Sequence, residues 1–403
     1  MTARPSWSAL ILFLAACTAG EGAPAETALE LAGPPGSGKS FLTPTRDGGA
    51  ILTWFEPTVE EASALRIAVR QAGTWSEPRT VAEHDRFFVN WADFPSVVET
   101  SDGRWVVHWL EKTAPRPYAY HVMLSTSADQ GQTWSAPIRA HADTSATEHG
   151  FAEMRANASG GVDMVWLDGN EMGGEHGGPM QLRFGTLLAD GTMSPELVLD
   201  EMTCECCQAR LIRTASGLVA TYRDRSPEEV RDIGVVRFAD GAWQAPTMVA
   251  NDGWVHRACP VNGPALGATG DRVGLAWYTQ GNETPRVMFA WSTDGGASFG
   301  APVRLDAGQP IGRPDLLVEA DGSAIVAWLE GTGERDAEWR LVRIDAEGTP
   351  GTALSIYHTA QARNAGFLRM TRAGNDLLAT VTAVGDSGGM RVLRVPAPAR
   401  AAR

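Results

Sequence analysis

The chain has 403 residues, of which 43% are hydrophobic, so it is long enough to bury a large core. Its 44 Gly, 24 Pro and 14 Trp residues favour many short strands joined by turns over a helical bundle or a disordered chain. The formal net charge of −14 excludes the basic surface by which proteins bind nucleic acid or an anionic membrane surface.

The N-terminal segment predicts export. Residues 1–16 contain an apolar run from Ala9 to Ala16 that is too short to span a bilayer and is typical of a secretory signal. The run ends in Leu-Ala-Ala-Cys17, which resembles a bacterial lipobox, where the signal is cut before the cysteine and the thiol is lipidated. A plain signal peptide with an incidental cysteine is the alternative. The residue after Cys17 is Thr18 and not an Asp. We therefore expect the lipid anchor to lie in the outer membrane in preference to the inner membrane.

After the signal segment of residues 1–16, the sequence predicts three further parts of the chain. Residues 17–25 form the lipidated Cys17 and a flexible tether, residues 26–396 a single domain, and residues 397–403 a C-terminal tail.

One early motif imitates a phosphate-binding loop. Residues 33–40, Gly-Pro-Pro-Gly-Ser-Gly-Lys-Ser, match G-x-x-x-x-G-K-[ST]. Such a loop needs a following helix whose N-terminal amides hold the phosphates. Pro44 and the pair Gly48-Gly49 come next and forbid that helix, so we expect no ATP binding.

A repeat fills the rest of the chain. Each unit has an apolar segment, a Gly or Asp-Gly turn, and an alternating strand with an aromatic residue at its end. Successive copies, 51–57 residues apart, end at Trp54, Trp109, Trp166, Tyr222, Trp277, Trp328 and, in degraded form, near Thr382. This period predicts an all-β propeller of four-stranded blades, seven in number with six as the fallback. We expect the strand Thr27 to Leu31 to complete the last blade and close the ring.

Two outer hairpins carry the more specific motif S-x-D-x-G-x-x-[WF]. Its members are Ser127, Asp129, Gly131 and Trp134 in one hairpin, and Ser292, Asp294, Gly296 and Phe299 in the other. The pattern resembles the Asp-box of the sialidase superfamily. Its role is structural: the carboxylate accepts hydrogen bonds inside a tight turn and the aromatic side chain packs between sheets. The resemblance implies that these turns lie on the face opposite the functional site.

The remaining loops predict where that site lies. Loops that join one blade to the next should share a face with the loops between the second and third strands of each blade. Binding candidates on that face, centred on blades three to six, are Trp91, Asp93, Trp254 and His256. Acidic residues also follow the strand-ending aromatic in several units, namely Glu56, Glu111, Asp168, Asp224 and Glu330. Such a ring could hold a cation such as Ca²⁺, supply acid/base carboxylates, or pair with arginines.

The sialidase resemblance implies a catalytic set. Members of that family grip a carboxylate with three arginines and use a Tyr nucleophile beside a Glu, with an Asp as acid/base. Candidates by position are Arg257, Arg313, Arg223 or Arg225, Tyr278 or Tyr222, Glu283 and Asp224. The family's early Arg-Ile-Pro signature is absent, and Arg313-Pro314 comes late in the chain.

Four cysteines besides Cys17 form a further candidate site. Cys204, Cys206 and Cys207 open the fourth unit and Cys259 opens the fifth, so adjacent blades should bring them together. In an oxidising envelope two disulfides are expected, with three possible connectivities. The alternative is a thiolate site for Cu(I) or Zn²⁺ with His256 as a possible further ligand.

The sequence thus predicts a lipid-anchored propeller of the bacterial envelope that recognises a glycan or an envelope partner. An exo-sialidase or related glycoside hydrolase is one alternative. A thiolate metal or redox protein is the other.

Overall fold

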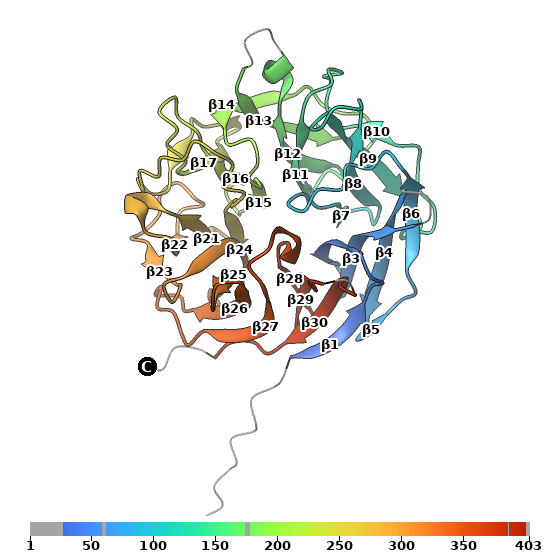
Figure 1. The fold of residues 1–403 in the computed structure, drawn as a ribbon. Coiled ribbons are helices and arrows are strands. Elements are labelled where there is room, and N and C mark those ends of the chain that lie inside the picture. The colour runs from blue at the N-terminus through green and yellow to red at the C-terminus, as the bar shows by residue number, and fades with distance from the viewer. Residues whose placement is uncertain (1–26, 59–61, 174–177, 386, 400–403) are drawn as a thin grey trace, which may run out of the picture.

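The computed structural model describes residues 27–58, 62–173, 178–385 and 387–399. Seven antiparallel sheets stand in a ring around a central axis (Figure 1). The only helical elements in these residues are three short 3₁₀ turns, η1 (Asn170–Gly173), η2 (Gly281–Glu283) and η3 (Arg363–Ala365). The predicted seven-bladed propeller is therefore confirmed.

Each blade is a meander that runs outward from the axis. The first three blades consist of β2 (Gly38–Pro44), β3 (Ala50–Pro57), β4 (Ser63–Gln71), β5 (Thr74–Trp75) and β6 (Arg79–His84); β7 (Ser96–Glu99), β8 (Trp105–Lys112), β9 (Tyr120–Ser127) and β10 (Ile138–Arg139); and β11 (His149–Ala156), β12 (Val162–Asp168), β13 (Met180–Leu187) and β14 (Leu197–Thr203). The fourth and fifth are β15 (Arg210–Arg213), β16 (Leu218–Arg223), β17 (Ile233–Ala239), β18 (Ala242–Trp243) and β19 (Thr247–Met248); and β20 (Ala265–Thr269), β21 (Arg272–Thr279), β22 (Arg286–Ser292) and β23 (Val303–Arg304). The sixth is β24 (Pro310–Val318), β25 (Ala324–Gly331), β26 (Asp336–Ile344) and β27 (Leu354–Ala360).

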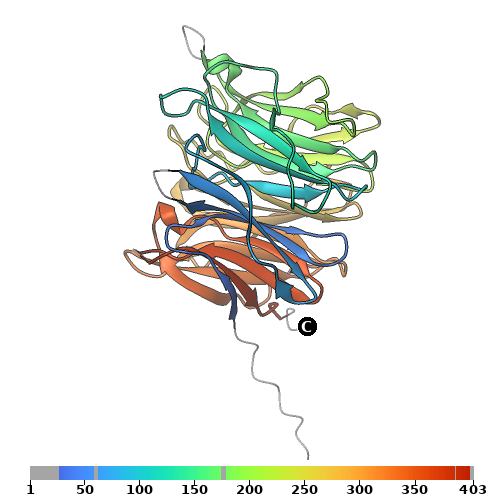
Figure 2. The ribbon, with the colours of Figure 1, turned by 90° about the vertical axis from the view of Figure 1, so that its right-hand side faces the viewer.

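The seventh blade joins the two ends of the chain. It contains β28 (Arg369–Ala373), β29 (Asp376–Thr382) and β30 (Met390–Val395), and its outer strand is the N-terminal β1 (Ala28–Ala32). Strand β1 pairs antiparallel with β30, as the adjacent blue and red ribbons of Figures 1 and 2 show. The predicted closure by this segment is thus confirmed, and it pairs the outer edge of β30.

The second strand of each blade explains the repeat. Its aromatic side chain lies between neighbouring sheets, where Trp54, Trp166, Trp277 and Trp328 are almost completely buried. A buried indole N–H needs an acceptor. The carboxylate two residues later supplies it in several blades, at 2.8 Å from Trp166 Nε1 to Asp168 Oδ2 and 2.6 Å from Trp328 Nε1 to Glu330 Oε2. The recurring acid is therefore part of the blade core.

The two Asp-box turns are built from contacts within four residues. In each, the serine hydroxyl donates to the aspartate at 2.7 Å, from Ser127 to Asp129 and from Ser292 to Asp294. The serine oxygen also accepts the glycine amide two residues beyond the aspartate. Gly131 has a φ of 77°, and a Cβ there would meet Trp105 and Trp134 at 3.1–3.2 Å. Glycine is thus required by both conformation and packing.

A network of buried charges closes the centre of the ring. Arg210 on β15 donates to Glu153 on β11 at 3.2 Å and to Asp315 on β24 at 3.0 Å, and Arg369 on β28 lies 3.6 Å from Asp315. Four inner strands are joined in this way. A cavity of about 360 Å³ lies at the axis and is lined by residues of all seven inner strands.

Residues 33–40 lead into strand β2, so the helix that phosphate binding would require is replaced by a strand. No helix in the described residues is long and apolar enough to cross a membrane.

Candidate functional site

The blade-joining loops surround a pocket of about 700 Å³. As predicted, the loops between blades share this face with a loop between the second and third strands of blade two. The lining residues are Lys39, Phe88, Val89, Asn90, Trp91, Ala92, Pro117, Tyr118, Glu148, Phe151, Glu205, Cys206, Cys259, Val261 and Arg363. Most of these residues come from the first five blades. The sequence had predicted a site centred on blades three to six.

The backbone around the pocket is unusually strained. Lys39, Tyr118, Phe151 and Val261 all line it with φ between 48° and 58°, a region that side chains other than glycine rarely enter. The strain recurs at register shifts in inner strands, where Lys39 lies in a bulge of β2 and Phe151 in a bulge of β11. Bulges redirect side chains, and strained residues cluster at functional sites.

Aromatic side chains form part of the pocket wall. Trp91 is half-buried, with its ring 5.8 Å from that of Phe367 and the Arg313 guanidinium 4.8 Å above it. Tyr118 is 58% exposed and meets Phe88 edge-on at 6.2 Å. Trp91, predicted as a binding residue, therefore lies in the pocket lining, held between neighbouring side chains.

Two cations in the pocket lack a countercharge. Among the described residues, neither Lys39 nor Arg363 has an ion-pair partner, and Lys39 is half-buried. Glu205, by contrast, is paired with Arg225 and with Arg231. Burial raises the pKa of Glu148 to about 7, against a smaller lowering by the Tyr120 hydroxyl, so this carboxyl is partly protonated near neutral pH. Burial also lowers the pKa of Lys39, so desolvation disfavours the charged form of both Lys39 and Glu148.

Asp93, another predicted binding residue, supports the wall from behind. Its buried carboxylate accepts the Phe151 amide at 2.5 Å and the Phe94 amide at 2.9 Å. Burial raises the pKa of Asp93 to about 7 in spite of these bonds. Its role is to hold the strained Phe151 backbone.

Arg223 and Arg313, two predicted catalytic arginines, are buried and bonded to backbone carbonyls. Arg223 donates to the carbonyls of Asn262, Arg231 and Tyr278, and only 1% of it is exposed. Arg313 donates to the carbonyls of Ala362 and Gly366. The substrate-gripping role inferred for Arg223 is wrong, because its guanidinium joins blades four and five.

The predicted nucleophile pair is not assembled either. Tyr278 is 8% exposed, packs against Trp254, and has a pKa that burial raises. Glu283 is exposed in η2, and within the described ranges no hydrogen bond joins it to Tyr278. Arg257 is exposed and outside the pocket lining, and burial raises the pKa of Asp224 to about 6.

Trp254 and His256, two predicted binding residues, do not line the pocket. Trp254 is 5% exposed and lies between Arg223, 4.8 Å away, and the ring of Tyr278, so the predicted stacking surface is wrong. His256 packs on Trp254 with ring centroids 5.1 Å apart. Both belong to the packing between blades four and five.

The predicted acidic ring does not converge on a cation site. Glu330 accepts the Trp328 indole and the Gln309 amide, Asp168 accepts the Trp166 indole, and Glu111 pairs with Arg86 at 2.9 Å. In the part of the chain that the structure describes, these acids form no group with metal-site spacing. The Ca²⁺ interpretation is wrong because each carboxylate serves its own blade.

The cysteines do converge. Cys204, Cys206 and Cys207 place their Sγ atoms within 4.8 Å of one another, and Cys206 and Cys259 both line the pocket. All four are free thiols, so the predicted disulfides are not present. The Sγ atoms of Cys204 and Cys207 are 3.1 Å apart, well beyond a bond of about 2.05 Å.

The local electrostatics favour a thiolate at Cys204. Burial opposes ionisation, but hydrogen bonds from Cys206 and Cys207, with the nearby Arg223, hold the pKa of Cys204 well below its usual range. The Asn262 amide also donates to Cys207 Sγ at 3.4 Å. A buried thiolate with neighbouring sulfur atoms is suited to a soft metal ion.

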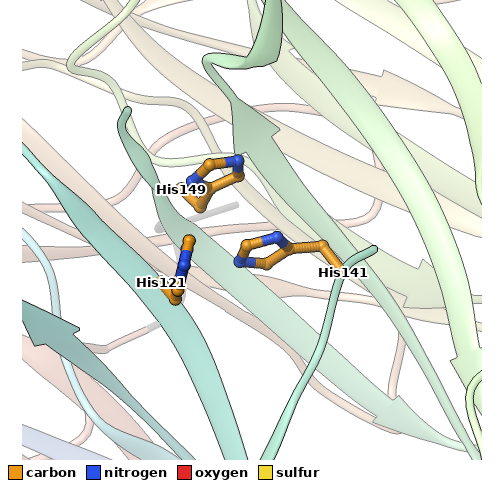
Figure 3. A group of neighbouring side chains, drawn as sticks. All are labelled: His121, His141 and His149. Atoms are coloured by element: carbon orange, nitrogen blue, oxygen red, sulfur yellow. The ribbon is translucent and has the colours of Figure 1, made fainter. Parts of the chain in front are cut away.

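A second convergent group was missed from the sequence. His121, His141 and His149 offer ring nitrogens within 4.8 Å of one another (Figure 3). His121 lies on β9, His149 opens β11, and His141 lies between β10 and β11. Their wide separation along the chain hid the group. Tyr118 and Glu148 were also missed as pocket residues, since neither belongs to a motif, and Lys39 belongs only to the phosphate-loop-like motif at residues 33–40.

No family model matches the sequence, and no curated protein does. Among solved structures, a polysaccharide lyase described as an ulvan lyase bound to -[GlcA(1-4)Rha3S]- has a TM-score of 0.59 at 10% identity, over 92% of this chain and 96% of that one. An α-L-arabinanase of Penicillium chrysogenum has a TM-score of 0.51 at 14% identity over 75% and 92%. A Hadza microbial sialidase has 0.50 at 12% over 85% and 72%. The chain is similar to these proteins in fold, and its own sheets form a β-propeller.

Proposed function

We propose that this chain is an envelope-anchored protein that binds an acidic glycan in the pocket on its blade-joining loops. The observation that carries the proposal is the pocket of about 700 Å³, which combines aromatic faces with two cations that have no ion-pair partner among the described residues. Sugar rings stack on aromatic side chains, and cations recognise their carboxylate or sulfate groups.

The chemistry of the lining favours an acidic over a neutral glycan. Lys39 and Arg363 enter from opposite ends of the chain, on blade one and before blade seven. Glu205 is neutralised by its arginine partners, and the raised pKa of Glu148 reduces its negative charge. An anionic ligand would thus meet a net attraction in a partly desolvated site, where charge pairs gain strength.

The test is calorimetric titration of residues 26–403 with three probes: sialyllactose, a GlcA–Rha3S oligosaccharide and neutral arabinobiose. We expect one acidic probe to bind and arabinobiose to bind at least about tenfold more weakly. Trp91→Ala and Arg363→Gln should each weaken that binding by about tenfold or more, since central aromatic and Arg contacts dominate binding energy.

Arg394→Gln is the matched control for charge. Arg394 is 54% exposed on β30 and pairs with Glu30, away from the pocket lining, so its loss should leave binding unchanged. Failure of every acidic probe to bind, or equal binding by Trp91→Ala, Arg363→Gln and the parent, would contradict the proposal. Release of free sugar from a bound probe would instead make the protein an enzyme.

The anchor is a separate part of the proposal. Cys17 and residues 1–25 lie outside the described residues, so this part depends on the lipobox-like sequence alone. Palmitate labelling of the full chain in a bacterial host tests it. We expect label in the parent and none in Cys17→Ser, which should move to the soluble fraction. Unlabelled parent protein would support the plain signal peptide.

The cysteine cluster supports a second candidate function, binding of a soft metal ion by thiolates. Cys206 and Cys259 reach the pocket, while Cys204 and Cys207 are buried behind them. Cu(I) and Zn²⁺ both accept such sulfur ligands. An ion held there would lie at the wall of the glycan pocket.

Thiol titration of denatured protein, with metal analysis of the same sample, tests this candidate. Four free thiols with Cu or Zn bound are expected, and Cys204→Ser should lower the metal content by one equivalent. Absence of both thiols and metal would show that the cysteines become disulfides in the envelope.

A further inference from the structure

We propose that His121, His141 and His149, with Asp143, form a binding site for a divalent first-row metal ion, best suited to Zn²⁺. The site is distinct from the cysteine cluster and is independent of the proposed glycan function. It lies where blade two meets blade three, and Figure 3 shows the three rings grouped together, from β9, from the loop after β10 and from the start of β11.

The three rings are buried together, and only part of their hydrogen-bonding capacity is satisfied among the described residues. His149 is completely buried and His141 is 4% exposed, and their planes are parallel with centroids 3.9 Å apart. His121 Nδ1 and His141 Nδ1 have no hydrogen-bond partner among the described residues. Buried polar nitrogens are costly when unpaired. A metal ion would satisfy both.

The surroundings of His149 resemble the support that metal-bound histidines use. Its Nδ1 lies 3.2 Å from the Tyr120 carbonyl, to which it can donate, so loss of the Nε2 proton would leave Nε2 free to ligate a metal ion. That Nε2 lies 2.9 Å from Asp143 Oδ2. Asp143 is itself oriented by Ser145, whose amide and hydroxyl both donate to it. A carboxylate is thus fixed beside the three imidazoles as a fourth ligand.

The spacing of the ring nitrogens also suits a metal ion. Around a tetrahedral zinc ion the ligand atoms lie about 3.3 Å apart. The nitrogens, within 4.8 Å of one another, therefore need shifts of roughly 1 Å each. His141 must also give up a long 3.3 Å contact from the Val122 amide to its Nε2.

Three imidazoles and one carboxylate form a ligand set that Zn²⁺, Ni²⁺ and Cu²⁺ accept, whereas Ca²⁺ and Mg²⁺ prefer oxygen ligands. The ion would tie β9 to β11 directly behind Glu148, which lines the pocket. We therefore assign it a structural role at the blade junction.

The test uses chelator-treated protein in which Cys204, Cys206, Cys207 and Cys259 are replaced by Ser, so that thiols cannot compete. Titration with Zn²⁺ should give one equivalent bound per chain. Co²⁺ should give visible d–d bands without sulfur-to-cobalt charge transfer. His141→Gln and His149→Gln should each weaken Zn²⁺ binding by about a hundredfold, as expected for loss of a ligand.

His358→Gln is the matched control, because the His358 side chain is 83% exposed and distant from the cluster in sequence, and it should bind Zn²⁺ like the parent. If the cysteine-free protein does not fold, metal analysis of wild type and His141→Gln replaces it. One equivalent of metal should then disappear at an unchanged thiol count. Binding equal in His141→Gln, His149→Gln and His358→Gln, or no binding at all, would overturn the proposal.

Discussion

The Asp-box turns and the pocket lie on opposite faces of the propeller. They also differ in how far apart in the sequence their contacting residues are. Each Asp-box is held largely from within, since the side-chain hydrogen bonds of Ser292 and Asp294 reach no further than four residues. The pocket draws its lining from residues 39 to 363 and depends on blades that are far apart in the sequence. Repeated residues therefore build the blades, and residues outside the repeat carry the candidate chemistry.

The same contrast separates the two kinds of carboxylate. Asp168 and Glu330 recur with the repeat and accept buried indole N–H groups of their own blade. Asp315 and Asp93 occur once and connect different blades, through Arg210 and through the Phe151 amide. A recurring acid near a channel mouth is thus a poor indicator of a cation site.

The largest effect is expected at the centre of the ring. Asp315→Ala would remove the carboxylate that bonds Arg210 and lies 3.6 Å from Arg369, and breaking such a buried network costs about 3–5 kcal/mol. We expect this loss in the free energy of unfolding from urea titrations. Asp376→Asn is the control, because Asp376 pairs with Arg70 at a side chain that is 33% exposed, and it should cost at most about 1 kcal/mol. Equal losses would mean that the central network contributes no special stability.

A smaller effect is expected at the Asp-box. Ser292→Ala removes a buried hydroxyl that donates to Asp294 at 2.7 Å and accepts the Gly296 amide at 2.9 Å. Leaving that amide unpaired should cost about 1–3 kcal/mol of stability. Because the turn is self-contained, binding of the acidic glycan should not change. A variant that lost binding at unchanged stability would show that the two regions are coupled.

The smallest effect is a pH dependence of the same turn. Burial opposes ionisation of Asp294, but hydrogen bonds from Ser298 and Ser292 outweigh it and lower its pKa from 3.8 to about 2. A depressed carboxyl pKa stabilises the fold above the unfolded-state value, so this contribution is present above about pH 4 and lost as the pH falls to about 2. The difference in unfolding midpoint between wild type and Asp294→Asn should therefore shrink over that range. A difference independent of pH would contradict the assignment.

The sequence predicted the fold more completely than the site. The spacing of Trp54, Trp109 and their counterparts led to seven blades and to closure by the N-terminal strand. Trp91, Cys206 and Cys259, which the sequence predicted as site residues, line the pocket. Arg223 and Trp254 were misassigned, because side-chain direction at a strand end cannot be obtained from position in a repeat. His121 and His141 were missed because their neighbourhood exists only after blades two and three pack.

The sequence by itself determined the number of blades, the ring closure and the Asp-box turns. These features depend on period, on strand alternation and on hydrogen bonds between near neighbours, all of which are local properties of the chain. Only the tertiary structure decided which cations at the pocket have no ion-pair partner among the described residues and which arginines donate to backbone carbonyls. It also decided which histidines and which cysteines lie close together. Those outcomes depend on bulges such as the one at Phe151 and on contacts between blades more than fifty residues apart, as between Arg210 and Asp315. These contacts between blades set which side chains are buried and which hydrogen-bond or ion-pair partners they have, and no local sequence pattern encodes either.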